Sequence, residues 1–395
     1  MIYRFSKFFS RKILTLLASS FILGLTGCLV SNKEEEPSVP VIVEKPKDSV
    51  IVKKPIEPII EKAMIFAVTS DYKTGSYSVY GLDSAFTSKD IAPIHSDAAV
   101  RFAGGNDILV LNRLGRDNMQ VVDRHNLQTV LQFNFPAASN PYDVVVKDSL
   151  FYVGFYAYSK IGVYRQKDGS KLEEIDISAF TDTVDFLPET AALKILGNNL
   201  YVILGNLDAK SFLYSPLQAR LLQIDLLTKS TKSLDLPFGN PLSITYDSAS
   251  NKFFIPCAGT LSNPDYTLKK DGAILGINLS SLTVSDTVAT ETTLGGGLNK
   301  TVYYKGKLYM DLTTEAEGMT LEKLISINLA DKKAETMAEA KGYEMSGLVI
   351  DEKTNTLYLG DRRAGLRIFD LATGQEKEGS KINLGLPISD LAIVR

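Results

Sequence analysis

The chain has 395 residues, 45% of them apolar and 23% charged, and its 43 basic and 46 acidic residues leave a formal net charge of −3. This composition is typical of a folded globular protein and excludes a disordered or fibrous chain. Two His are too few for a three-His metal site, two Cys are too few for a disulfide framework, and the balanced charge argues against nucleic-acid binding.

Residues 1–27 have the pattern of a secretory signal peptide. Residues 1–12 contain four basic residues and no acidic one, and a mostly apolar run follows at residues 13–25. As a helix this run would rise about 20 Å, which is short of the roughly 30 Å hydrocarbon core of a membrane. We therefore expect cleavage, with a signal anchor as the alternative. Removal of this basic segment changes the net charge from −3 to −7.

Residues 25–28 read Leu-Thr-Gly-Cys, and this motif resembles the lipobox of bacterial lipoproteins. The resemblance implies that Cys28 is lipidated and becomes the first residue of the mature chain; a structural Cys in a plain signal or anchor is the alternative. No Asp follows Cys28 directly, and residues 31–36 resemble the acidic surface-export signals of Bacteroidetes-type lipoproteins. These resemblances imply an outer-membrane lipoprotein of the bacterial cell envelope, exposed at the cell surface. They leave the membrane leaflet open.

Residues 28–62 are predicted to form a tether. Five of the fifteen Pro fall between residues 31 and 62, among Glu, Lys, Val and Ile. Pro and charge favour an extended chain of about 3 Å per residue, so a folded domain could stand up to roughly 100 Å from the bilayer. A disordered leader without this role is the alternative.

Residues 63–395 are predicted to form one domain built from repeats. Short apolar runs and period-two patterns recur with turn residues between them, and no long amphipathic helix is evident. Each unit reads as a strand, a tight turn, a strand with Tyr or Phe, a loop, a strand ending near Asp, a short turn and a strand. The unit is clearest at residues 140–177 and recurs at 240–288 and 345–378.

The spacing of these units predicts a seven-bladed β-propeller. First strands are expected near Ala99, Tyr142, Ala191, Pro241, Asn299, Ser346 and Ser389, at intervals of 43 to 58 residues, the period of four-stranded blades. The last start has no room for three further strands, whereas residues 64–69, 77–82 and 90–94 supply three strands without a first one. Pairing the two chain ends in one blade completes the seventh and removes open sheet edges. A rival all-β arrangement, such as a pair of sandwiches, is the alternative.

Residues 140–169 resemble the YVTN-type repeat of bacterial propellers. The resemblance extends over most of residues 97–395 and implies the propeller fold. The chain lacks the Trp of WD40 repeats and the Ser-x-Asp-x-Gly-x-Thr-Trp box of sialidases, so it departs from both of those propeller families.

Loop lengths predict which face of the propeller carries function. With the strands of a blade labelled a to d from the channel outward, the a–b and c–d turns are expected to be short and to share one face. The long connections are expected between strands b and c, at residues 205–219, 258–272 and 313–322, and between blades, at residues 179–189 and 290–298. Loops on a rigid scaffold carry function, so we expect the binding site on the face of these long loops.

Aromatic and charged side chains within these loops are the candidate binding residues, since Tyr and Arg are frequent at binding hot spots. For any single residue, the alternative is that Tyr fills space between blades and Arg is merely solvated. The candidates are Tyr72, Arg113, Arg116, Tyr156, Tyr158, Asp208, Tyr214, Asp265, Tyr266, Arg362 and Arg363.

Signals for catalysis are few. The Gly at residues 295–297 fit neither a phosphate-binding loop nor a dinucleotide motif and are expected in a turn between blades. His95 and His125 are predicted on opposite faces, so no Ser–His–Asp group is recognisable, and Cys257 is expected to be buried packing. No cofactor is predicted. The carboxylates considered for a structural Ca²⁺ are Glu189, Asp265, Glu315 and Glu317, although no Asp-x-Asp-x-Asp loop is present.

The leading interpretation is a membrane-anchored, surface-exposed binding or interaction protein, with a monomeric domain, that presents its long-loop face to a small ligand, glycan or envelope protein. The alternative is a propeller-type hydrolase or lactonase with a metal held by carboxylates. A third hypothesis is a scaffold within an envelope assembly. The sequence leaves ligand identity and any catalytic activity open.

Overall fold

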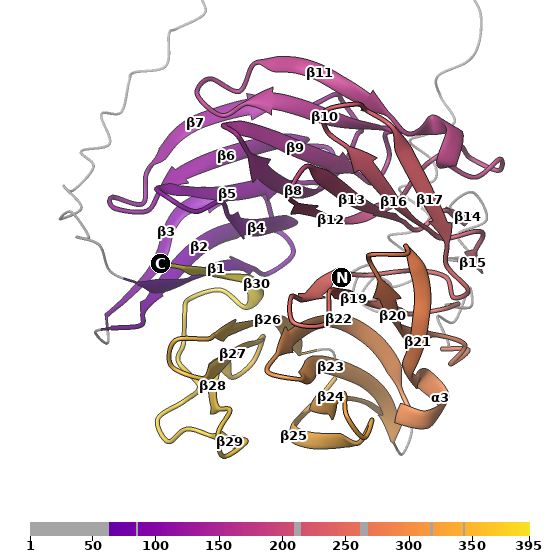
Figure 1. Cartoon of the computed structure of the whole chain (residues 1–395). Coiled ribbons are helices and arrows are strands. Elements are labelled where there is room, and N and C mark those ends of the chain that lie inside the picture. Colours follow the sequence, from indigo (N-terminus) through magenta and orange to yellow (C-terminus); the bar gives the residue numbers. More distant parts are fainter. Residues whose placement is uncertain (1–62, 84–85, 209–214, 261–267, 317–318, 343) are drawn as a thin grey trace, which may run out of the picture. The chain divides into compact units, whose positions relative to one another are not determined.

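The computed structural model of the chain describes residues 63–395 except 84–85, 209–214, 261–267, 317–318 and 343. In this part of the chain, seven four-stranded antiparallel sheets follow one another around a central channel (Figure 1). The predicted all-β, seven-bladed propeller is therefore confirmed. Regular helix is limited among the described residues to one 3₁₀ turn, η1 (Ser178–Phe180), and one four-residue helix, α3 (Glu291–Leu294).

Blade 1 is built from both ends of the described chain. Its innermost strand is β30 (Ile388–Val394), and β1 (Met64–Ser70), β2 (Gly75–Gly81) and β3 (Thr87–Ile94) follow outward. β30 pairs antiparallel with β1, with Met64 opposite Val394. The predicted closure of one blade by N- and C-terminal strands is thus confirmed.

The other six blades are continuous in sequence, and their strands run outward from the channel in chain order. Blade 2 contains β4 (Ala98–Phe102), β5 (Asp107–Asn112), β6 (Asn118–Asp123) and β7 (Thr129–Asn134). Blade 3 contains β8 (Pro141–Lys147), β9 (Leu150–Phe155), β10 (Lys160–Arg165) and β11 (Lys171–Asp176). Blade 4 contains β12 (Thr190–Leu196), β13 (Asn199–Leu204), β16 (Arg220–Asp225) and β17 (Thr231–Asp235).

Blade 5 contains β18 (Thr245–Asp247), β19 (Lys252–Cys257), β20 (Ala273–Asn278) and β21 (Thr283–Thr290). Blade 6 contains β22 (Gly297–Tyr304), β23 (Lys307–Ala316), β24 (Met319–Asn328) and β25 (Ala334–Lys341). Blade 7 contains β26 (Met345–Asp351), β27 (Thr356–Asp361), β28 (Gly365–Asp370) and β29 (Gln375–Glu376). A separate hairpin, β14 (Leu207–Asp208) and β15 (Ser215–Pro216), lies within the b–c connection of blade 4.

The hydrophobic core lies between neighbouring blades. The apolar strand β1 is buried along its whole length, whereas the outermost strands β7 and β11 carry mainly exposed polar residues. Where blades 1 and 2 meet, Phe66 stacks on Tyr77 with ring centroids 4.8 Å apart, and both pack in a cluster with Val110. Each such side chain contributes about 1.5–3 kcal/mol by leaving water, so contacts between blades hold the ring together.

The innermost strands are joined across blades by side chains, because their inner edges have no neighbouring strand to pair with. The backbone N–H of Val100 donates to Asp390 Oδ2 at 3.0 Å, and the N–H of Leu193 donates to Asp143 Oδ2 at 2.8 Å. The N–H of Thr301 donates to Ser243 Oγ at 3.2 Å. The first two bonds link the innermost strand of one blade to that of the next, and the third links β22 of blade 6 to the segment just before β18 of blade 5.

Two details of the strand prediction are corrected. The first strand of blade 5 begins at Thr245 instead of near Pro241, which forms only an isolated bridge with Cys257, because Pro has no N–H to give to a ladder. The expected long loop at residues 313–322 of blade 6 is largely an extension of β23 and β24, which pair as far as Ala316 and Met319.

Candidate binding face and central channel

Successive strands of a blade run in opposite directions, so the a–b and c–d turns share one face, here called the short-turn face. The b–c and blade-to-blade connections share the other, here called the long-loop face. The long-loop face carries the β14–β15 hairpin, η1 and α3, in residues 205–219, 177–189 and 291–296. The short-turn face has connections of two to five residues, such as 148–149 and 305–306. The connections on the two faces therefore differ in length, as the sequence predicts.

Two buried glutamates hold the long connections in place. Glu189 Oε2 accepts the N–H of Leu207 at 2.9 Å, which ties the link between blades 3 and 4 to the hairpin of blade 4. Glu291 accepts the N–H groups of Gly272 and Leu298 at 3.0 and 2.9 Å. Burial raises the pKa of Glu189 to about 9 and that of Glu291 to about 7. Glu189 is therefore protonated at neutral pH and has a structural role in holding these connections together.

Tyr72 and Arg362 lie far apart in sequence and are brought together on the long-loop face. The guanidinium carbon of Arg362 lies 4.1 Å from the centre of the Tyr72 ring, a distance at which cation and ring attract. Arg362 also donates to the carbonyl oxygen of Ser70 at 2.8 Å. Arg363, next in sequence, is exposed and pairs with Glu344 at 2.7 Å.

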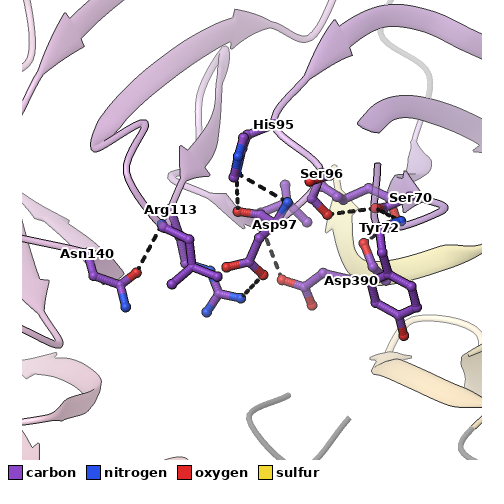
Figure 2. Close-up of polar contacts among 12 residues, drawn as sticks. Ser70, Tyr72, His95, Ser96, Asp97, Arg113, Asn140 and Asp390 are labelled. Atoms are coloured by element: carbon purple, nitrogen blue, oxygen red, sulfur yellow. Dashed lines mark hydrogen bonds and ion pairs between the residues drawn. The ribbon is translucent and has the colours of Figure 1, made fainter. Parts of the chain in front are cut away.

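Arg113 lies in the b–c connection of blade 2, as expected, but its side chain is buried. Its guanidinium pairs with Asp97 at 2.5 Å, and Figure 2 shows the two side chains facing each other near His95 and Asp390. The guanidinium carbon of Arg113 also lies 5.0 Å from the centre of the Tyr142 ring. Arg116, three residues later, is exposed.

The remaining candidates divide between packing and loops. Tyr156 is half-buried, with its ring 5.6 Å from that of Tyr142. Tyr158 donates to Glu174 at 3.0 Å and so fastens its loop to β11. Asp208 lies in β14 and is half-buried. Cys28, Tyr214, Asp265 and Tyr266 lie outside the described residues, as does the proposed calcium ligand Glu317.

Most of the exposed large apolar side chains lie in connections of the long-loop face, and none of them is among the aromatic and charged candidates. Eight large apolar side chains are exposed among the described residues. Three lie elsewhere: Val130 and Leu172 on outer strands, and Leu227 in a short turn. The five on the long-loop face are Leu114, Val184, Phe186, Leu217 and Met319. Apolar side chains gathered on one face favour a contact surface.

The central channel contains a second group of residues that sequence reasoning missed. A cavity of about 420 Å³ is lined by the innermost strands of blades 2, 3, 4 and 6 and by residues 242–244. Its polar and charged lining residues are Arg101, Asp143, Lys194, Ser243 and Lys300. The available signal was a charged residue inside each of several predicted first strands, where a buried apolar run is expected.

The carboxylates of the channel, Asp143 and Asp390, form ion pairs with Arg101. Arg101 donates to Asp143 at 2.6 Å and to Asp390 at 3.3 Å, so it bridges blades 1, 2 and 3. Lys300 lies across from them, with its ammonium 5.9 Å from the centre of the Tyr142 ring. Burial and the neighbouring Arg101 lower the pKa of Lys300 to about 8, although its side chain still reaches channel water.

No arrangement for nucleophilic or metal catalysis is visible in the described part of the chain. His95 lies in a blade-to-blade link and His125 in a c–d turn, so they occupy opposite faces. Cys257 is fully buried, as predicted, and burial raises the pKa of its thiol. Within the described residues, no three His, Cys, Asp or Glu side chains come together as a metal-binding group, and Glu315 is exposed on β23.

Fold and strand order place the described chain in the class of seven-bladed β-propellers. No protein-family model and no curated protein matches the sequence. Among solved structures, it is similar to hydrazine synthase of Kuenenia stuttgartiensis, with a TM-score of 0.55 and 15% identity over 70% of this chain and 78% of that chain. It is also similar to a functionally unknown protein of Desulfotomaculum acetoxidans, with a TM-score of 0.53 and 11% identity over 84% and 98% of the two chains. At these identities the similarity shows the fold alone.

The described residues include no helix with the length and apolar character needed to cross a lipid bilayer.

Proposed function

We propose that the protein is a lipid-anchored binding protein of the bacterial cell surface and that it holds a partner on its long-loop face. The observation that carries the proposal is that five of the eight exposed large apolar side chains of the described residues lie on that face, opposite the point where the chain enters the propeller. The propeller fold fits a binding or interaction role, because it presents loops of all seven blades on one face.

The position of the first strand supports the orientation. β1 is the second strand of blade 1 counted from the channel, so it starts on the short-turn face and ends on the long-loop face. The carbonyl oxygen of Ala63, just before β1, accepts the N–H of Leu82 in the c–d turn of the same blade. A tether that ends at Ala63 and is lipidated at Cys28 would attach to the short-turn face. The long-loop face would then be the side of the propeller opposite the attachment of the tether.

Three of the exposed apolar side chains lie on two hydrogen-bonded connections, the link between blades 3 and 4 and the b–c connection of blade 4. Phe186 is 62% exposed, and Val184 and Leu217 accompany it on two loops that are bonded to each other. Asn206 joins those loops, since its side chain donates to the carbonyl oxygen of Phe180 at 3.1 Å. Aromatic and aliphatic side chains at this position favour an envelope protein as the partner over a highly polar ligand.

Face-specific substitution tests this proposal. Phe186→Asp on the long-loop face and Leu227→Asp on the short-turn face remove exposed apolar side chains of similar size and add the same charge. After cross-linking on intact cells, we expect Phe186→Asp to lose at least half of the captured partner and Leu227→Asp to keep it. Equal capture by both variants would remove the assignment to the long-loop face.

The anchoring part of the proposal has its own readout in the same cells. With Cys28→Ser, we expect the protein to leave the outer-membrane fraction and to become inaccessible to a protease added outside intact cells. Retention of a Cys28→Ser protein in that fraction, still open to external protease, would contradict lipid anchoring through Cys28.

A further inference from the structure

We propose that the central channel binds a small molecule carrying a carboxylate, phosphate or sulfate group, held by Lys300 and Lys194. This inference goes beyond the proposed function, because it concerns the channel and not the long-loop face. The cavity of about 420 Å³ has the size of a small-molecule pocket and is bordered by these two lysines, Arg101 and Ser243.

The carboxylates of the channel already have partners. Asp143 accepts a hydrogen bond from Arg101 with one oxygen and from the backbone N–H of Leu193 with the other. Asp390 accepts from Arg101 and Val100 with one oxygen and from the N–H of Leu391 with the other. These acids therefore complete the protein's own bonding and leave little capacity to neutralise further cations.

Unlike Arg101, the two lysines of the cavity form no ion pair with a described residue. Among the described residues, neither the Lys300 nor the Lys194 ammonium has an oxygen within ion-pair or hydrogen-bond distance. Lys300 instead lies over Tyr142, whose ring also attracts Arg113 from 5.0 Å. An ammonium that borders the channel water and has no anion as a partner can pair with an anionic group that enters the channel.

A donor beside the lysines adds direction to the site. Ser243 Oγ accepts the N–H of Thr301, so its hydroxyl hydrogen can be given to an anion oxygen. The apolar residues Leu242, Ile244 and Val145 also line the cavity, so the carbon skeleton of an organic anion can lie against them. The site therefore suits a small organic acid or phosphate ester better than a bare inorganic ion.

Titration of Lys300 makes the affinity depend on pH. The groups that face it are Arg101 on β4, Asp390 on β30, and Asp143 and Tyr142 on β8, with Arg113 at the edge. Its pKa of about 8 means that the ammonium is mostly charged at neutral pH and becomes neutral as pH rises through 8. Affinity for an anion is therefore expected to fall over that range.

Calorimetric titration of the full chain with sulfate and with citrate tests the site, since the charges of both probes are constant from pH 7.5 to 9.5. We expect saturable binding of both anions and none of glucose. Lys300→Gln should weaken binding about tenfold, the value of one charge-assisted hydrogen bond, while Lys300→Arg should retain it. Sulfate affinity of the unaltered chain should fall markedly between pH 7.5 and 9.5, and that of Lys300→Gln should not.

The matched control is Lys333→Gln, which removes one positive charge from a short turn of the same blade. Its affinity should equal that of the unaltered chain. Absence of saturable binding, or equal weakening by Lys333→Gln, would overturn the channel site. Neither outcome depends on partner capture by the long-loop face, so the two proposals fail separately. Variants that do not show the unaltered chain's circular dichroism are replaced by Lys194→Gln.

Discussion

At the scale of single residues, two buried glutamates of the long-loop face depend on pH for their contribution to stability. Glu189 and Glu291 accept backbone N–H groups of the connections that they organise, and burial raises both pKa values. A pKa raised above that of the unfolded chain, about 4.5, means that the contribution to stability is complete below pH 4.5. The contribution is lost as pH rises through 7 for Glu291 and through 9 for Glu189.

Glu189→Gln should therefore flatten the dependence of stability on pH. Between pH 5 and 9, the thermal midpoint of the unaltered chain should fall more than that of the variant, because the Gln amide has no proton to lose. Scanning calorimetry at several pH values measures this difference, with the exposed Glu352→Gln as the control. Parallel curves for all three proteins would contradict the assignment.

Residue roles were less predictable from sequence than strand positions. Arg113 lies in the b–c connection that the sequence predicts, yet its side chain is buried against Asp97 and Tyr142. The sequence around a residue that follows a strand does not show whether its side chain is buried or exposed. The residues that would bury it come from distant parts of the chain. For the same reason, the approach of Arg362 to Tyr72 across 290 positions left no local signal.

At the scale of elements, the c strands end in a repeated turn. Asp123, Asp225, Asn278, Asn328 and Asp370 each close a c strand, and their side chains accept N–H groups within the turn that follows. The later turn position often has positive φ, as at Gly169 and Gly374, a conformation that Gly adopts without cost. This recurrent Asp or Asn was visible in the sequence because turn chemistry is local.

Asn278→Ala in blade 5 should lower the free energy of unfolding by about 1 kcal/mol. The substitution removes the side-chain oxygen that accepts the N–H groups of Ser280 and Ser281 at 2.9 and 3.2 Å. Asn278→Asp keeps an acceptor at this position and should stay close to the unaltered chain. Urea denaturation measures both, and equal midpoints for Asn278→Ala and the unaltered chain would remove the turn from the sources of stability.

At the scale of the whole molecule, the ring is closed by strands and not by a covalent bond. Ser78 and Ser389 reinforce the closure, since each donates a side-chain hydrogen bond across blade 1 to the opposite end of the chain. Six of the seven first strands start within two residues of the predicted positions, and the shared blade followed from counting the remaining strands. The spacing of repeats predicts the number of blades because each blade has to bury its own faces against two neighbours.

Deletion of residues 388–395 should abolish cooperative unfolding. The truncated chain loses β30 and exposes the inner edge of β1 together with the buried faces of blades 7 and 2. Circular dichroism during heating and light scattering measure the loss of the transition and the expected aggregation. A peptide of residues 386–395 added in trans should restore part of the transition. A sharp transition in the truncated chain without peptide would show that six complete blades suffice.

The pairing of β1 with β30 also bears on the order in which the molecule is made. Ser389 bonds to Val68 across 321 positions of the chain, so the first strand of the domain to leave the ribosome waits for the last one. Contacts between such distant segments slow folding, and during that time the apolar residues 64–68 have no partner on one side. A chaperone that binds apolar strands would therefore bind β1 first, and we expect its release only after β30 has been synthesised.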